Sequence, residues 1–179
     1  MQPDRQLVER AKQGERAACE ELVRRHQDRV FHYALYLLPS WQDAEDVTQE
    51  TFLQACRNLK RFRGEASFAT WVLAIARTQV ALWYRRRKRQ REVIEVSDLT
   101  QADPAPPVLL QIEIRGAVAQ LPTSYREAIV LRYVNGLDLV EVAKALGISA
   151  GAAGVRLHRA RRLLRESLGP VLSEEEVRP

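Results

Sequence analysis

Residues 138–168 read DLVEVAKALGISAGAAGVRLHRARRLLRESL. Asp138 and Glu141 have the spacing of a capping box, which predicts the start of a short amphipathic helix. Gly147-Ile148-Ser149 predicts a turn, and we expect Ser149 to cap a second helix that ends at Gly169-Pro170. Two helices joined by a short turn with Gly are typical of a helix-turn-helix, so this stretch predicts a DNA-binding element.

The second of these helices has the composition of a recognition helix. Its first five residues, 150–154, are Ala or Gly, which would let the helix approach base edges closely. Arginine suits both phosphate and guanine contacts. Arginines occupy positions 156, 159, 161, 162 and 165, with His158 among them. The alternative is a solvated basic helix that closes a three-helix core.

The preceding C-terminal segments are also predicted to be helical. We expect a helix from about Val108 to Gln120, and a second one through Val134 that Ser124 and Glu127 cap. Asn135-Gly136 predicts a turn.

Upstream, four more helices are predicted from apolar residues at three- and four-residue steps. Asp4 is expected to cap the first, which ends at Gly14. Pro39-Ser40 ends the second, Ser40 and Asp43 begin a third that runs from Trp41 to Leu59, and Ser67 caps a long helix that reaches about Arg89. No segment shows the sustained alternation of a strand, so we predict an all-α protein.

A change of composition separates two groups of helices. Residues 92–107 carry acidic residues, Ser97, Thr100 and three prolines, which is typical of a linker. We therefore predict two small helical domains, 1–91 and 108–179, joined by a flexible linker over 92–107.

Positive charge is concentrated in one part of the chain. The net charge of the 179 residues is +5, with 28 basic and 23 acidic side chains. Counting along the sequence gives −3 for residues 1–50 (7 basic, 10 acidic), +10 for 51–91 (11 and 1) and −2 for 92–179 (10 and 12). A polyanion is the natural partner of such a basic block.

The block ends in the run Arg85-Arg86-Arg87-Lys88-Arg89-Gln90-Arg91, directly after Trp83-Tyr84. Aromatic side chains beside basic ones suit single-stranded nucleic acid, because the rings stack on unpaired bases. The alternatives are a solvated helix end and a nonspecific tail. Phe68 and Trp71 share a face with Ile75, so we expect them in the core.

The remaining composition excludes several classes of protein. Cys19 and Cys56 lie 37 positions apart without a Cys-x-x-Cys pair, which argues against a disulfide scaffold and a cysteine zinc site and suits a reducing cytoplasm. The charged N-terminus is unlike a secretory signal, and no apolar stretch is long enough for a membrane span. No nucleophile–base pair or phosphate loop is visible, so we expect neither catalysis nor a cofactor.

An acidic stretch, residues 43–50, allows three readings. Asp43, Asp46 and Glu50 share a helix face and could hold a metal, although a hard cation needs more converging oxygens. A solvated face and a docking surface for a protein partner are the other readings, and we favour docking. His26, His32 and His158 lack ligand spacing.

Together these segments resemble the bacterial extracytoplasmic-function (ECF) sigma factors, the minimal two-domain class of RNA polymerase specificity subunits. The second conserved region of that family is similar to DAEDVTQETFLQACRNLKRFRGEASFATWVLAIAR at 43–77. The fourth is similar to LPTSYREAIVLRYVNGLDLVEVAKALGIS at 121–149 and RLHRARRLL at 156–164. The resemblance covers nearly all of residues 4–168 in the same order.

The resemblance implies three sets of contact residues. The third helix would dock on the clamp helices of the largest subunit of core RNA polymerase through Asp43, Asp46, Gln49, Glu50, Leu53 and Arg57. The −10 element would be bound as a single strand, with a base flipped out, by Phe62, Arg63, Gly64, Ser67, Thr70, Arg77, Thr78, Trp83, Tyr84, Arg85, Arg86 and Lys88. The −35 duplex would be read by Ser149, Ala150, Gly151, Ala153, Gly154, Arg156, Arg159 and Arg162.

The resemblance also implies the polymerase flap and an anti-sigma factor as partners, a cytoplasmic location, a linker that threads through the polymerase, and no extra C-terminal domain. Two departures bear on DNA recognition. The family often has Asn at Thr78, and commonly has Thr-Val-Lys-Ser where this chain has Ala-Ala-Gly-Val at 152–155. We therefore expect an altered −10 preference and a less typical −35 readout that depends more on Arg156 and Arg159.

Two other functions fit parts of the sequence. An autonomous helix-turn-helix regulator would bind duplex tightly without polymerase. A metal-dependent nuclease or recombinase would cleave DNA through the acidic helix, and Asp46→Ala would abolish cleavage.

Overall fold

The computed structural model describes residues 3–93 and 109–168, and this part of the chain is helical with no strand. The chain divides into two compact units, residues 1–103 and 104–179. The predicted linker, 92–107, lies almost entirely outside the described residues. None of the helices in the described ranges combines the length and apolar content needed to cross a membrane.

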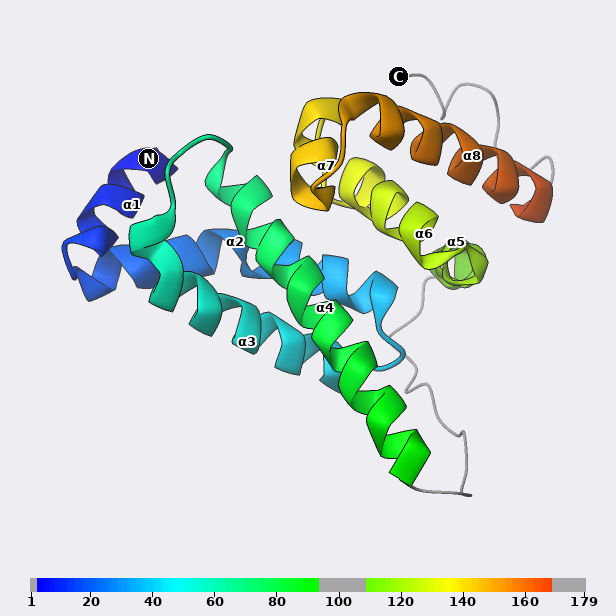
Figure 1. Ribbon diagram of the computed structural model, residues 1–179, viewed down its shortest axis with the longest axis horizontal. Coiled ribbons are helices and arrows are strands. Elements are labelled where there is room, and N and C mark those ends of the chain that lie inside the picture. Colours follow the sequence, from blue (N-terminus) through cyan, green and yellow to red (C-terminus); the bar gives the residue numbers. More distant parts are fainter. Residues whose placement is uncertain (1–2, 94–108, 169–179) are drawn as a thin grey trace. The chain divides into compact units, whose positions relative to one another are not determined.

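The described part of the N-terminal unit contains four α-helices: α1 (Asp4–Lys12), α2 (Arg16–Leu37), α3 (Trp41–Asn58) and α4 (Phe68–Val93). A short 3₁₀ turn, η1 (Leu59–Arg61), follows α3. Helix α2 packs against the other three helices, and α3 also packs against α4. In Figure 1, α4 is one continuous helix whose C-terminal end projects beyond α2 and α3. The largest fully buried side chains of this unit are Val8, Leu22, Val30, Tyr33, Leu37, Val72 and Leu73.

Two of the predicted caps in this unit are confirmed. The Ser40 hydroxyl accepts a hydrogen bond from the Asp43 backbone N–H at 3.1 Å and begins α3. The Ser67 hydroxyl accepts one from the Thr70 N–H at 3.1 Å and begins α4. Each cap satisfies a backbone donor that the first helical turn leaves without a partner.

The predicted cap at Asp4 is wrong. Pro3 is the N-cap of α1, and its carbonyl accepts from the Gln6 N–H at 3.0 Å. The Asp4 carboxylate instead contacts Arg25 and His26 of α2. A carboxylate with a cation and a ring N–H available nearby makes stronger, charge-assisted hydrogen bonds there than at a cap.

The two cysteines also differ from the prediction. Cys19 of α2 and Cys56 of α3 form a disulfide, with Cα atoms 6.9 Å apart. The spacing of 37 residues matches no short motif, but α2 and α3 pack side by side and bring the two positions together. Closing a loop of this length stabilises a fold by about 4 kcal/mol in the chain-entropy model.

The C-terminal unit contains α5 (Leu109–Gln120), α6 (Thr123–Ile129), α7 (Leu139–Leu146) and α8 (Ala150–Leu168). Helix α8 packs against the other three. Its buried residues are Ala153, Leu157 and Ala160. They meet a core formed by Ala128, Val130, Leu131, Val142 and Leu146.

The predicted capping box at Ser124 and Glu127 is wrong. The N-cap of α6 is Pro122, two residues before Ser124, and its carbonyl accepts from the N–H groups of Tyr125 and Arg126. Glu127 is only 8% exposed and faces the core, away from the position of a capping side chain. After Ile129 the helix widens into one π-helical turn, η2 (Val130–Val134), in which the Asn135 N–H donates to the Val130 carbonyl at 3.0 Å.

The helix-turn-helix prediction agrees with the structure. Asp138 and Glu141 form the complete capping box of α7. Gly147 then turns the chain with φ +65°, a left-handed conformation that Gly adopts without strain. The Ser149 hydroxyl accepts from the Ala152 N–H at 3.2 Å and begins α8.

Candidate functional site

Helix α3 presents one exposed face along most of its length. Asp46, Gln49, Leu53 and Arg57 are all exposed, at steps of three and four residues. Leu53 is the apolar centre of this face and is 52% exposed, although a leucine on a packed helix normally points inward. Glu50 is half-buried, and its carboxylate accepts from the Gln54 amide at 2.8 Å. The face is acidic at its N-terminal end and apolar in the middle, which suits a protein partner.

Asp43, at the start of the same helix, is held within the unit. Its Oδ1 accepts a hydrogen bond from Trp83 Nε1 at 2.9 Å, and its Oδ2 lies 4.0 Å from Nη1 of Arg87. The Ser40 hydroxyl donates to the same carboxylate. Arg87 also stacks over the Trp83 ring, 5.0 Å from its centroid. Asp43 therefore ties the N-terminus of α3 to the C-terminal half of α4.

Trp83 and Tyr84 are consequently bonded within the protein. Trp83 is half-buried, and Tyr84 is 41% exposed with its hydroxyl donating to the Leu37 carbonyl. The two rings meet edge to face, 4.9 Å apart. Arg87 also lies over the Trp83 ring, so bases can stack only on the ring surface that these contacts leave exposed.

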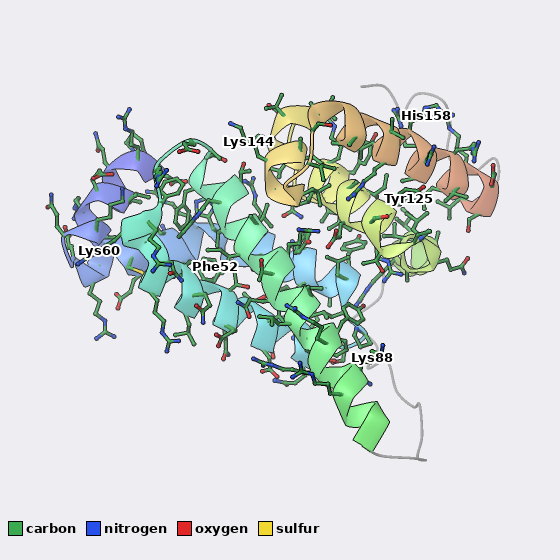
Figure 2. All side chains as sticks on the ribbon, viewed as in Figure 1. Phe52, Lys60, Lys88, Tyr125, Lys144 and His158 are labelled. Carbon is green, nitrogen blue, oxygen red and sulfur yellow. A yellow bond between two sulfur atoms is a disulfide. The ribbon has the colours of Figure 1, made fainter. Side chains whose placement is uncertain are left out.

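Beyond Tyr84, the described part of the basic run is exposed. Residues 85–89 are all exposed on the final turns of α4, where Lys88 is labelled in Figure 2. Arg85 and Arg86 have no hydrogen-bond or ion-pair partner among the described residues. On the preceding turns, Arg77 is half-buried and Thr78 is exposed, with its hydroxyl bonded to the Ala74 carbonyl at 3.2 Å. These positions form a basic surface at one end of α4.

A pocket of about 420 Å³ lies at the other end of α4. It is formed by the loop before α4 and by α1. Phe62 is buried and packs against Trp71 at 5.0 Å and Phe68 at 6.0 Å between ring centroids. Gly64 turns the loop with φ +75°. The lining side chains include Arg5, Lys12, Phe62, Arg63, Ser67 and Phe68.

A polar cluster fixes α1 beside this pocket. Asp4 Oδ2 lies 2.7 Å from His26 Nε2, and Asp4 Oδ1 accepts from Arg25 Nη1 at 3.1 Å. Burial lowers the pKa of His26 below its ordinary value of 6.5 and outweighs the opposing effect of Asp4, while the charges of Arg29 and Arg25 lower it further. His26 also packs on Phe68, with ring centroids 5.1 Å apart. The His26 ring therefore supports both the pocket wall and α1.

Helix α8 presents the exposed residues that the sequence predicts to contact duplex DNA. Ala150, Gly151, Ala152 and Val155 are exposed in its first turns, followed by His158, Arg159 and Arg162 (Figure 2 labels His158). Arg156 is half-buried, and neither it nor Arg159 has an ionic or hydrogen-bond partner among the described residues. Gly154 lies inside the helix, where it costs about 1 kcal/mol relative to Ala.

Besides Phe62, two more predicted contact residues are buried. Ala153 is fully buried because it shares the inner face of α8 with Leu157. Thr70 is 1% exposed, and its hydroxyl is 2.7 Å from that of Ser67. Neither side chain reaches the surface. Thr70 instead positions Ser67, which is exposed, and Ala153 positions α8 against the core.

Sequence reasoning missed the contacts between elements. The sequence placed Arg87 in the basic run but did not predict its contact with Asp43. It also did not predict the contact between Asp4 and His26. No short motif links positions 22 residues apart on α1 and α2, or 40 apart on α3 and α4. Within residues 3–93 and 109–168, no three His, Cys, Asp or Glu side chains are grouped as a metal ion would require.

Comparison with known protein families gives two matches in chain order. The model of Sigma-70 region 2 matches residues 22–90, and that of Sigma-70 region 4 matches residues 111–164. The first match spans α3, the pocket loop and most of α4. The second spans the helix-turn-helix.

Curated relatives match along most of the chain. The ECF RNA polymerase sigma factor SigW of Bacillus subtilis is 30% identical over 177 residues, with 90% of this chain and 94% of that protein covered. The RNA polymerase sigma-H factor of Pseudomonas aeruginosa is 31% identical over 186 residues, with 96% of each covered. For the ECF sigma factor SigE of Mycolicibacterium smegmatis, identity is 34% over 172 residues, and the chain spans 66% of its length.

Solved structures agree with this assignment. CnrH, in complex with the cytosolic domain of CnrY, has a TM-score of 0.75 at 28% identity, with 94% of this chain and 99% of that chain covered. The sigma factor RpoE of Bartonella quintana, in complex with the anti-sigma factor NepR, shares the fold, with a TM-score of 0.72 at 23% identity over 86% of this chain and 98% of that chain. The chain therefore belongs to the extracytoplasmic-function (ECF) sigma factors, which act in transcription initiation by bacterial RNA polymerase.

Proposed function

We propose that this sigma factor docks on the clamp helices of core RNA polymerase through the exposed face of α3. The observation that carries this proposal is the exposure of Leu53, 52%, in the middle of a face formed with Asp46, Gln49 and Arg57. An exposed apolar residue ringed by charges is the common form of an interface centre and its rim. Asp43, at the edge of this face, would contribute through the position it gives to α4.

The pocket between α1 and the loop 62–67 is the proposed site for a flipped base of the −10 element. Aromatic walls suit a base face, and Arg5, Lys12 and Arg63 suit the flanking phosphates. Extruding a base costs a few kcal/mol, which these contacts would offset. The exposed basic end of α4 would then hold the backbone through Arg85, Arg86 and Lys88.

Helix α8 is the proposed reader of the −35 element in the major groove. Its exposed first turns bear only small side chains as far as Ala153, while Arg156, Arg159 and Arg162 follow on the next turns. This arrangement lets the N-terminal end approach base edges while the arginines contact guanine or phosphate.

Two further protein partners are proposed. Tyr133 and Val134, 47% and 37% exposed at the end of η2, offer an apolar contact for the polymerase flap. RpoE of Bartonella quintana is solved with an anti-sigma factor, and we propose a partner of that class for this chain. Both interactions would take place in the cytoplasm, where core polymerase works.

Run-off transcription with core RNA polymerase tests the docking proposal. The template is the DNA fragment upstream of the gene for this protein, and promoter binding is followed with and without core. We expect transcription only with core, and a loss of five- to thirtyfold in core affinity for Asp46→Ala and Leu53→Gln, as for residues central to an interface.

Asp28→Ala is the matched control, because Asp28 is an exposed aspartate on α2, outside the α3 face. It should transcribe as the wild type does. Equal activity of all three variants would contradict docking through α3. Tight duplex binding by the protein alone, without initiation, would point to an autonomous regulator, and metal-dependent cleavage would point to a nuclease.

A further inference from the structure

The outer face of α8 contains one side chain that the arginine-based readout does not use. From Ala150 onward the helix carries Ala, Gly, Ala, Ala and Gly before Val155. Val155 is therefore the first side chain of α8 larger than a methyl group. It is 52% exposed, on the side of the helix opposite Ala153 and Leu157.

The residues that precede Val155 on α8 have very small side chains or none. Gly151 and Gly154 lie four residues and one residue before it, and both adopt helical backbone geometry. A Cβ built on either would meet no atom within 4 Å, so the packing of this unit does not require glycine there. Glycine is also a poor helix former. Because neither glycine has a side chain, the Val155 isopropyl group projects further from the helix surface than the residues before it.

Positive groups follow Val155 on the same face. Arg159 is four residues further along and Arg162 seven, which places all three side chains in one row. Arg159 has no partner among the described residues, and Arg162 has only Glu166, at 3.7 Å. A duplex held by these arginines would lie against Val155 as well.

We propose that Val155 reads the C5-methyl group of a thymine in the −35 element. The inference rests on the proposed role of α8. In the major groove thymine presents a methyl group, whereas cytosine presents an amino donor at the adjacent position. The valine side chain is wholly apolar, so it gains contact with the C5-methyl group of thymine, which cytosine lacks. Val155 is thus a specificity-determining residue that favours thymine.

The test removes a single methyl group from the DNA. Holoenzyme made from the full chain and core polymerase first selects promoters from a duplex library randomised over the −35 region. Each thymine of the selected −35 sequence is then replaced by deoxyuridine, one at a time. For the wild type, we expect one position at which deoxyuridine weakens binding about fourfold, the effect of burying one methyl group.

Variants then connect that position to the protein. In Val155→Ala the deoxyuridine effect should disappear, and in Val155→Ile it should persist, because isoleucine retains the branched apolar surface. Val140→Ala is the matched control, because Val140 is 54% exposed but lies on α7. It should keep the wild-type ratio of thymine to deoxyuridine binding.

Two results would overturn the inference in different ways. A selected −35 sequence in which no deoxyuridine effect depends on Val155 refutes the thymine readout and leaves the role of α8 standing. If the wild-type holoenzyme selects no −35 sequence at all, the proposed role of α8 fails, and the readout fails with it.

Discussion

Asp43 shows how one side chain links two surfaces of this molecule. The family resemblance predicts that Asp43 contacts core polymerase. Its carboxylate instead accepts from Trp83 Nε1 at 2.9 Å, beside Arg87 at 4.0 Å. Because the pair is half-buried, the hydrogen bond is less screened than a surface contact. The bond therefore holds the end of α4 at a defined place against α3.

Replacing Trp83 with phenylalanine removes this donor and keeps an aromatic ring. We expect Trp83→Phe to lower the free energy of unfolding of the N-terminal unit by about 1.5–3 kcal/mol, the usual contribution of a hydrogen bond to a charged acceptor. Urea unfolding followed by tryptophan fluorescence measures this directly, because all three tryptophans lie in that unit.

Trp41→Phe provides the comparison. Trp41 is 39% exposed and contacts the Phe31 ring, with no hydrogen bond from its indole among the described residues. Its replacement should cost less than that of Trp83. The assigned role of the Trp83–Asp43 bond is contradicted if both variants unfold at the same urea concentration.

His26 makes the stability of the same unit depend on pH. Its pKa is lowered from 6.5, mainly by burial, so the unfolded chain takes up a proton at higher pH than the folded one. The stability is thus fully present above about pH 6.5 and is lost as the pH falls through the lower pKa of the folded state. The pKa of Glu21 is about 2, so this neighbour stays ionised throughout that range.

Urea unfolding between pH 7.5 and 5 measures this dependence. His26→Gln should flatten the fall in stability, whatever its effect on absolute stability. His32→Gln, the same change at an exposed position on α2, should leave the fall in place. A steep fall that persists in His26→Gln would assign the dependence to another group.

At this scale the sequence predicts local contacts well and distant ones poorly. The caps at Ser40, Ser67, Asp138 and Ser149 depend on neighbours three residues away, and all four were predicted correctly. Asp4 failed because its partners, Arg25 and His26, come from another helix. A side chain prefers the stronger of two available bonds, and only the fold shows which are available.

Among the helices, α8 is the element in which stability and function are most clearly opposed. Gly151 is exposed, and a Cβ there would meet no atom within 4 Å. We expect Gly151→Ala to stabilise α8 by about 1 kcal/mol through helix propensity. The same methyl group should weaken −35 binding, because it obstructs the close approach of the helix to base edges.

Hydrogen exchange of α8 measures the first effect, and binding of holoenzyme to −35 duplex measures the second. Gly116→Ala is the matched control, since Gly116 is an exposed glycine within α5 that also has no atom within 4 Å of a built Cβ. It should gain stability without losing DNA affinity. Improved stability and undiminished DNA binding in Gly151→Ala would mean that α8 does not approach bases at this position.

Helix existence followed from periodicity, and helix ends followed from caps and breakers where these are present. Such signals placed α3, α7 and α8 within a residue or two of their observed ends, and Pro39-Ser40 placed the end of α2. The π turn at Val130–Val134 was not predicted, because the sequence there keeps an ordinary helical pattern. The wider turn arises where Asn135, 4% exposed, directs its amide to the Val130 carbonyl at 3.3 Å.

Across the whole molecule, the uneven charge predicts how DNA binding responds to salt. Residues 51–91 carry +10 against −3 and −2 elsewhere. Each phosphate contact contributes about 0.7 to 0.9 to the slope of log affinity against log salt. We expect the double variant Arg85→Gln/Arg86→Gln to reduce the slope of promoter binding by about 1.4 to 1.8.

Filter binding of holoenzyme over a range of potassium concentrations gives the slope. Arg16→Gln/Arg24→Gln removes the same charge from α2, where both arginines pair with glutamates, and should leave the slope unchanged. An equal reduction in both double variants would show that net charge alone sets the slope, without contacts from the end of α4.

At this largest scale, the change of composition over residues 92–107 indicated two helical units, and the structure divides the chain into two. The disulfide between Cys19 and Cys56 was beyond such reasoning. Spacing motifs describe ligands that converge within a loop or a turn. Two cysteines on neighbouring helices converge only because of packing, which composition does not reveal.

Because α4 is one continuous helix, it fixes the distance between the pocket and the basic end of the N-terminal unit. Phe68, at the pocket, and Arg86, at the basic end, stand 18 residues apart on one helix, or about 27 Å along its axis. That length equals the rise of about eight base pairs of duplex. Deleting one residue between them would shorten this distance by only about 1.5 Å but would swing the arginines about 100° around the axis. Helix α4 therefore fixes both the distance between the pocket and the basic end and the direction in which the arginines point around the helix axis.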